Sequence, residues 1–158
     1  MADRNSDTKS PQKKWRFALV FSALCLTTLL AALDTSIIST ALPTIAADLN
    51  SETLYVWTIN SYLLSSTALQ PLFGQAANIF GRRSLTLLSV ALFALGSGVA
   101  GGAKTTAALI GGRTVQGIGG GGILTLVEIV VCDLVPLRER GKYVGLIGSM
   151  WVIGAITG

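Results

Sequence analysis

Long apolar stretches separate short charged clusters along this chain. Residues 53–81 and 84–103 contain no Asp, Glu, Lys or Arg, and each can supply the roughly 20 helical residues that cross the hydrocarbon core of a bilayer. The stretches lack the strict polar and apolar alternation of a barrel strand, and backbone groups in lipid must be paired within the protein. The pattern therefore predicts an all-α membrane protein. Its expected spans are residues 17–42, 54–73, 84–103, 106–133 and 143–158, the last of them incomplete.

The composition agrees with this class, and the distribution of charged and apolar residues divides the chain into two parts. Apolar residues make up 51% of the chain and charged residues 13%, a balance that is typical of integral membrane proteins. We expect residues 1–16 to form a basic cytoplasmic tail and residues 17–158 to form a partial bundle of transmembrane helices. No linker rich in Pro, Gly or Ser divides the chain further.

The basic residues predict the orientation of the helices. If the N-terminus is cytoplasmic, the basic residues outside the spans lie inside, with Lys104 as the exception, and the first outer loop carries Asp48 and Glu52 but no base. Cytoplasmic loops are enriched in Lys and Arg, so we expect a cytoplasmic N-terminus. The net charge of +4 then reports topology and not a nucleic-acid partner. The inner basic residues are Arg4, Lys9, Lys13, Lys14, Arg16, Arg82, Arg83, Arg138, Arg140 and Lys142.

The first span has an alternative interpretation as a cleaved secretory signal, because a basic segment precedes it. Its apolar run is longer than the hydrophobic region of a usual signal and continues past Asp34. We therefore expect a retained helix in an integral, multi-pass protein. The plasma membrane is its expected location, with the vacuolar or another internal membrane as the alternative.

Three ionisable residues, Asp34, Arg113 and Glu128, lie inside predicted spans, where a charge is costly and usually faces a partner or a water-filled cavity. At about 1.5 Å of rise per residue, Asp34 and Arg113 lie at similar depth in the outer half, and Gln116 shares a helix face with Arg113. We interpret Asp34 and Arg113 as a coupling site that responds to substrate or proton. A fixed structural ion pair, or Asp34 capping a helix break, is the alternative. A structural role is favoured for Glu128.

The glycine-rich residues 117–122 do not match a phosphate-binding loop, because no strand precedes them and no Lys-Ser/Thr follows. A flat helix face explains them better, since small residues let neighbouring backbones approach closely. The expected packing glycines are Gly117, Gly121, Gly145, Gly154 and Gly158.

Reactive groups are scarce in this chain. It contains no His, its Cys25 and Cys132 lie within spans as small apolar residues, and no cluster has metal-ligand spacing. No nucleophile lies beside a base in the sequence. These observations argue against an enzyme, a metal site and a cofactor.

A glycine-bracketed segment, residues 74–83, joins the second and third spans. Gly74 and Gly81 lie seven residues apart, and Arg82 and Arg83 end the segment. We expect a tight, positively charged hairpin, with a cytoplasmic salt bridge to Asp133 at the inner end of the fourth span.

Four motifs, in order, resemble those of the major facilitator superfamily. Residues 74–83 resemble its Gly-x-x-x-Asp-x-x-Gly-Arg-Arg/Lys signature, and residues 113–119 resemble its helix-4 motif, Arg-x-x-Gln-Gly-x-Gly. Residues 33–43 are similar to the helix-1 signature of the fourteen-helix drug:proton antiporter branch, and the glycine spacing in residues 145–158 is similar to its helix-5 motif. The sequence as a whole resembles those of fungal toxin and multidrug efflux pumps.

This resemblance implies outward transport of a drug, toxin or metabolite against proton entry, with a small-molecule substrate, the proton as coupling ion and the lipid bilayer as surroundings. It assigns Asp34, Arg113 and Gln116 to proton coupling and the substrate cavity. It also implies a conformational latch on the cytoplasmic side, weakened where Asn78 replaces the usual Asp of the signature. The latch residues are Gly74, Asn78, Gly81, Arg82, Arg83 and Asp133.

The expected fifth span is shorter than a full crossing, and the family pattern would continue beyond residue 158 into a second repeat. Alternating access needs two halves that move about a shared site. We therefore expect an N-terminal part of an efflux transporter, from a truncated gene model or partial sequence, whose C-terminal half is the missing partner. The alternatives are a membrane helix module that does not transport and a nutrient or sugar uptake porter of the same superfamily.

Overall fold

Five α-helices make up the described part of this computed structural model, which covers residues 11–48 and 52–158. No strand occurs in those two ranges, and the all-α prediction is confirmed. The first ten residues of the expected tail, with Arg4 and Lys9, lie outside the described residues. The helices are α1 (Pro11–Asp48), α2 (Glu52–Phe80), α3 (Arg82–Gly101), α4 (Thr106–Leu134) and α5 (Arg140–Thr157).

Three of these helices are long and apolar enough to cross a membrane within the described residues: Trp15–Ala41 in α1, all of α3 and all of α4. The other two, α2 and α5, are not among these: α2 contains many uncharged polar residues, and α5 is 18 residues long and begins with Arg140 and Lys142. Large apolar side chains such as Leu64, Leu87 and Leu95 point outward from α2 and α3. This exposed apolar surface suits a lipid environment.

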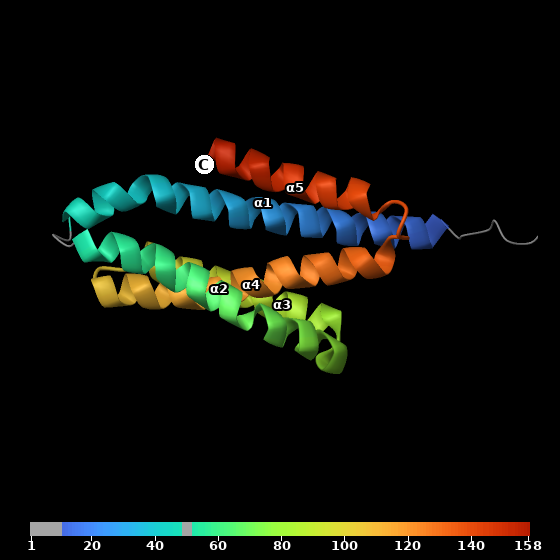
Figure 1. Ribbon diagram of the computed structural model, residues 1–158, viewed down its shortest axis with the longest axis horizontal. Helices are drawn as coiled ribbons and strands as arrows, with labels where there is room; N and C mark the ends of the chain where they lie inside the picture. Colours follow the sequence, from blue (N-terminus) through green and yellow to red (C-terminus); the bar gives the residue numbers. More distant parts are fainter. Residues whose placement is uncertain (1–10, 49–51) are drawn as a thin grey trace, which may run out of the picture.

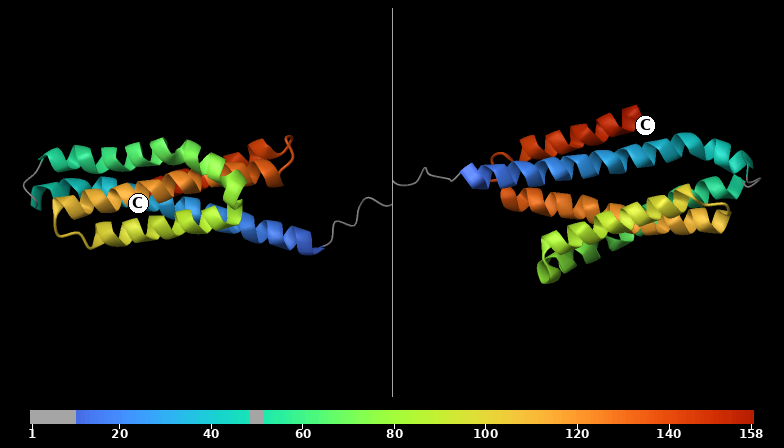
Figure 2. Two further views of the ribbon diagram at one scale, coloured as in Figure 1. Left: turned by 90° about the horizontal axis from the view of Figure 1, so that it is seen from below. Right: turned by 180° about the vertical axis from the view of Figure 1, so that it is seen from behind.

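The helices run up and down the long axis of the molecule in two groups. Figures 1 and 2 show α4 packed between α2 and α3, while α5 lies along α1. The start of α1, the α2–α3 turn and the α4–α5 connection share one end of the bundle (Figure 1). The up-and-down order expected from the sequence therefore brings the described basic connections to a single end.

Glycines on two sides of α4 allow α2 and α3 to approach its backbone. A Cβ built on Gly121 would lie 2.9 Å from the Cα of Ser66 in α2, and one built on Gly112 would lie 2.7 Å from the backbone nitrogen of Ala100 in α3. Gly117 likewise has no room for a Cβ beside Tyr62. These contacts are the close backbone approaches that small residues permit between membrane helices.

The helix-5 glycines differ in their surroundings. A Cβ on Gly154 would lie 2.7 Å from the Cβ of Ala32, and one on Gly158 would lie 2.9 Å from the Cβ of Ser36, so both glycines face α1. Gly145 has open space beside it. It makes no close helix contact within the described chain, whereas Tyr143 and Ile147 on either side of it pack against the apolar core of α1 and α4.

The expected hairpin over residues 74–83 is a continuation of two helices instead. α2 runs on to Phe80, seven residues beyond its predicted end, and α3 starts at Arg82. The turn is Gly81 alone, with φ +84° and ψ 148°, a conformation that costs glycine little and other residues about 1–3 kcal/mol. Gly74 lies within α2 at ordinary contact distance from Thr125 of α4. Packing on α4 therefore keeps residues 74–80 helical as part of α2, although Gly74 and Gly81 had predicted a loop there.

Candidate functional site

A polar cluster lies inside the bundle where α1, α2, α3 and α4 meet. Asp34 comes from α1, Tyr62 from α2, Ser97 from α3, and Arg113 and Gln116 from α4. Gln116 is fully buried, and the side chains of Arg113 and Asp34 are 3% and 20% exposed. Polar groups this deep need partners, because unpaired burial costs about 1–3 kcal/mol for a neutral group and more for a charge.

Asp34 and Arg113 form an ion pair across α1 and α4. The NH1 nitrogen of Arg113 donates to Oδ2 of Asp34 at 3.2 Å. The two residues are 79 positions apart in sequence, and their predicted similar depth is what brings them together. The charges cancel, which lowers the cost of holding either one away from water.

Gln116 bridges the two ends of this pair. Its side-chain oxygen accepts a hydrogen bond from NH1 of Arg113 at 2.5 Å, and its side-chain nitrogen donates to Oδ2 of Asp34. The spacing of three residues puts Gln116 on the same helix face as Arg113. One carboxamide therefore serves both a donor and an acceptor.

Two members of the cluster were not predicted from the sequence. The Oγ of Ser97 donates to Oδ1 of Asp34 at 3.1 Å, and the guanidinium carbon of Arg113 lies 4.6 Å from the ring centroid of Tyr62. A signal for Tyr62 existed: Thr58, Tyr62 and Ser66 recur every four residues in a charge-free span, and all three are buried. Ser97 carried no comparable signal.

The cluster is open in two ways that matter for chemistry. Asp34 keeps partial exposure, so a proton or a substrate can reach its carboxylate. Nε of Arg113 is buried and has no hydrogen-bond partner among the described residues, which leaves one guanidinium donor for an additional acceptor. A carboxylate and a guanidinium in this geometry can exchange partners when the carboxylate is neutralised.

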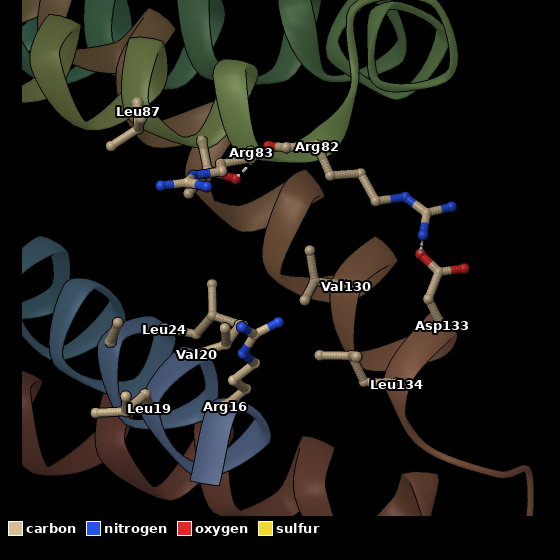
Figure 3. Close-up of a pocket in the computed structure, with 12 residues that line it drawn as sticks. Arg16, Leu19, Val20, Leu24, Arg82, Arg83, Leu87, Val130, Asp133 and Leu134 are labelled. Carbon is tan, nitrogen blue, oxygen red and sulfur yellow. Dashed lines mark hydrogen bonds and ion pairs between the residues drawn. The ribbon is translucent and has the colours of Figure 1, made fainter. Parts of the chain in front are cut away.

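The second group of predicted residues lies at the basic end of the bundle. Arg82, at the start of α3, forms an ion pair with Asp133 near the end of α4 (Figure 3). This pair is partly exposed, at 42% and 35% for the two side chains. Arg83 makes no ion pair within the described residues, and Asn78 is exposed on the last turn of α2. The structure therefore joins Arg82 to Asp133, and neither Arg83 nor Asn78 takes part in this ion pair.

Arg140 also stabilises this end of the bundle, a role that was not predicted from the sequence. Its NH2 donates to the backbone oxygen of Cys132 at 2.6 Å, and its Nε donates to that of Val135 at 3.3 Å. Both carbonyls belong to the end of α4, where unpaired carbonyls attract cations. Arg140 thus connects α5 to the end of α4.

Comparison with known proteins assigns the chain to a family. Residues 24–158 match the family described as Major Facilitator Superfamily. The chain is 67% identical to "Efflux pump FUS6" of Gibberella moniliformis, 66% to "MFS-type efflux pump LUC4" of a Fusarium species and 57% to "Acurin A biosynthesis cluster MFS-type transporter" of Aspergillus aculeatus. These matches cover 94%, 96% and 94% of this chain.

The same matches cover 26%, 27% and 27% of the relatives, so the chain spans about a quarter of the length of these curated relatives. All three are named as pumps or transporters and none of them as an enzyme. The match to the family extends over most of α1 and all of α2 to α5. The chain belongs to the Major Facilitator Superfamily.

Proposed function

We propose that this chain forms part of a proton-coupled transporter that moves small organic molecules out of the cytoplasm. The observation that carries the proposal is the buried contact between Asp34 and Arg113, bridged by Gln116. The family match and the names of the relatives support transport. The basic end of the bundle supports a cytoplasmic N-terminus, in the plasma membrane or in an internal membrane.

In the proposed mechanism, the charge state of Asp34 controls the contact. The ionised carboxylate holds the guanidinium of Arg113 on α4 and the carboxamide of Gln116. A proton that binds Oδ2 of Asp34 removes the negative charge and weakens both contacts. Arg113 is then free to turn its donors to another acceptor. Release of the proton restores the pair, so proton binding and helix movement are linked.

The ion pair between Arg82 and Asp133 acts in this proposal as a latch between α3 and α4. An exposed pair contributes about 0–1 kcal/mol, which is weak enough to break and re-form on each transport cycle. Gly81 provides the turn on which α3 pivots relative to α2. The chain would supply this latch on the cytoplasmic side.

Substitution of Asp34 tests the proton-coupled function. In proteoliposomes that hold the whole transporter of which this chain forms part, with an imposed proton gradient, Asp34→Asn should abolish gradient-driven substrate movement, while exchange down a substrate gradient continues, because only the titrating group is removed. Asp48→Asn is the matched control, since it removes a carboxylate from the exposed end of the same helix. Equal sensitivity of the two variants to the gradient, or gradient-driven transport by Asp34→Asn, would reject the coupling role.

A further inference from the structure

Tyr62 of α2 contacts the polar cluster without belonging to the ion pair at its centre. The guanidinium carbon of Arg113 lies 4.6 Å from the centroid of the Tyr62 ring, within the distance of about 6 Å at which a cation is attracted to the face of an aromatic ring. Tyr62 itself is buried, at 9% exposed. Arg113 therefore has two attractive contacts of different kinds, one with the carboxylate of Asp34 on α1 and one with the ring of Tyr62 on α2.

One face of α4 is shaped around Tyr62. The residues that share this face, at positions i, i+3, i+4 and i+7, are Arg113, Gln116, Gly117 and Gly120. A Cβ built on Gly117 would lie 3.1 Å from the Cα of Tyr62, and one built on Gly120 would lie 2.6 Å from its hydroxyl oxygen. Gly117 therefore makes room for the backbone of α2, whereas Gly120 makes room for the phenol.

Gly120 differs in this respect from its neighbour Gly121. A Cβ on Gly121 would meet backbone atoms of Ser66, whereas the three atoms nearest to a Cβ on Gly120 are the hydroxyl oxygen, Cζ and Cε2 of Tyr62, at 2.6, 3.3 and 3.5 Å. The hydroxyl oxygen alone lies closer than a real Cβ could tolerate. Without that oxygen, a methyl group at position 120 would need only a small shift of the ring.

The ring of Tyr62 offers Arg113 a contact that survives the loss of its counter-charge. Neutralisation of Asp34 removes the charge that pairs with the guanidinium, and a buried cation without a counter-charge is costly. Attraction to an aromatic face does not require a charged carboxylate. Because α2 packs directly on α4, the ring stays beside Arg113 when α1 is released. All of these groups belong to this chain, so their contacts do not depend on the part of the transporter outside it.

We propose that Tyr62 is a positioning residue for Arg113: its ring holds the guanidinium in place while Asp34 is neutral, and Gly120 leaves the space that the ring needs for this. The proposal rests on the proposed function, because it assigns Tyr62 to one step of the proton cycle. The position of Arg113 over the ring can be measured without transport. The two proposals can therefore fail separately.

Nuclear magnetic resonance of arginine side chains tests this position in the whole transporter of which this chain forms part, held in lipid nanodiscs. Arg113→Lys identifies the Arg113 signals by their loss. Protons over the face of an aromatic ring resonate upfield, so the side-chain protons of Arg113 should be shifted upfield. Tyr62→Phe should keep this shift because the ring remains, and Tyr62→Leu should abolish it. Asp34→Asn, which imitates the neutral carboxyl group, should also keep it.

Gly120 is tested by combining substitutions. Gly120→Ala should reduce the upfield shift of Arg113 and lower the unfolding temperature, because its Cβ displaces the phenol. In the presence of Tyr62→Phe, Gly120→Ala should cost less in both measurements, since the crowded oxygen is gone. Gly121→Ala is the matched control, because it crowds the backbone of Ser66 instead of the phenol. Its loss of unfolding temperature should be the same with and without Tyr62→Phe.

Equal Arg113 signals in Tyr62→Phe and Tyr62→Leu would overturn the proposal, as would loss of the upfield shift in Asp34→Asn. It would also be overturned if Tyr62→Phe failed to reduce the cost of Gly120→Ala, or reduced that of Gly121→Ala equally. Circular dichroism of each variant checks that its helices remain. If Arg113 keeps its place in Asp34→Asn while gradient-driven transport also continues, the proposed coupling fails and the contact with Tyr62 stands.

Discussion

Gln116 shows how single residues make an ion pair tolerable inside the bundle. Removing two charges from water costs several kcal/mol per ion, and the pair becomes acceptable only when further hydrogen bonds satisfy the remaining donors and acceptors. Gln116 supplies one of each, Ser97 supplies a hydroxyl, and the ring of Tyr62 covers the guanidinium of Arg113. The cluster is thus almost fully paired, and Nε of Arg113 is its one buried donor without a partner among the described residues.

Arg82 and Arg83 are adjacent but should respond differently to substitution. Arg82→Ala removes the ion pair with Asp133, so amide hydrogen exchange should speed up in residues 81–86 and 131–135 by at most about fivefold, the equivalent of up to about 1 kcal/mol. Arg83→Ala should leave these rates unchanged, because Arg83 has no ion pair in the described chain. Equal acceleration in both variants would show that total charge, and not the Arg82–Asp133 contact, holds the turn.

At the scale of elements, α4 organises the fold because both of its neighbours reach its backbone. Gly117 and Gly121 face α2, while Gly112 and Gly119 face α3. Lipid offers helices no hydrophobic gain from association, so close van der Waals contact has to hold them together. The same close contact places Tyr62 beside Arg113 and Ser97 within hydrogen-bond distance of Asp34. The close packing at the glycines of α4 and the geometry of the polar cluster therefore depend on each other.

Two glycines of α4 test this dependence. Gly121→Ala should lower the stability of the bundle by about 1–3 kcal/mol, because its Cβ would crowd the backbone of Ser66. Gly111→Ala should raise stability by up to about 1 kcal/mol, since a Cβ there meets nothing within 4 Å and Ala is the better helix former. Thermal unfolding in detergent, followed by circular dichroism, compares the two. Shifts of the same sign would contradict the packing role of Gly121.

At the scale of the whole molecule, the number and order of the helices were predictable from the sequence, since apolar length and helical rise act along the chain. The pairing of Asp34 with Arg113 followed from depth alone. The extension of α2 to Phe80, the open side of Gly145 and the contribution of Ser97 were not predictable. Each of these depends on which helix lies beside which residue, and the order of the elements does not determine that.

The orientation of the bundle in the membrane remains a prediction, and two positions at opposite ends test it. Lys104 lies in the α3–α4 connection and Arg138 in the α4–α5 connection, and both are exposed. With Cys25 and Cys132 replaced by Ser, Lys104→Cys should react with a membrane-impermeant maleimide on intact cells. Arg138→Cys should react only after permeabilisation, because the basic end is expected to be retained in the cytoplasm.

The reverse labelling pattern would invert the proposed direction of transport and place the Arg82–Asp133 latch outside the cell. Labelling of both positions from the same side would contradict the assignment of α4 as a membrane-spanning helix, because both ends of α4 would then lie on that side. The polar cluster around Arg113 would in that case lie outside the hydrocarbon region, and proton access to Asp34 could not be linked to a change of side. Correct topology is therefore a condition of the coupling mechanism.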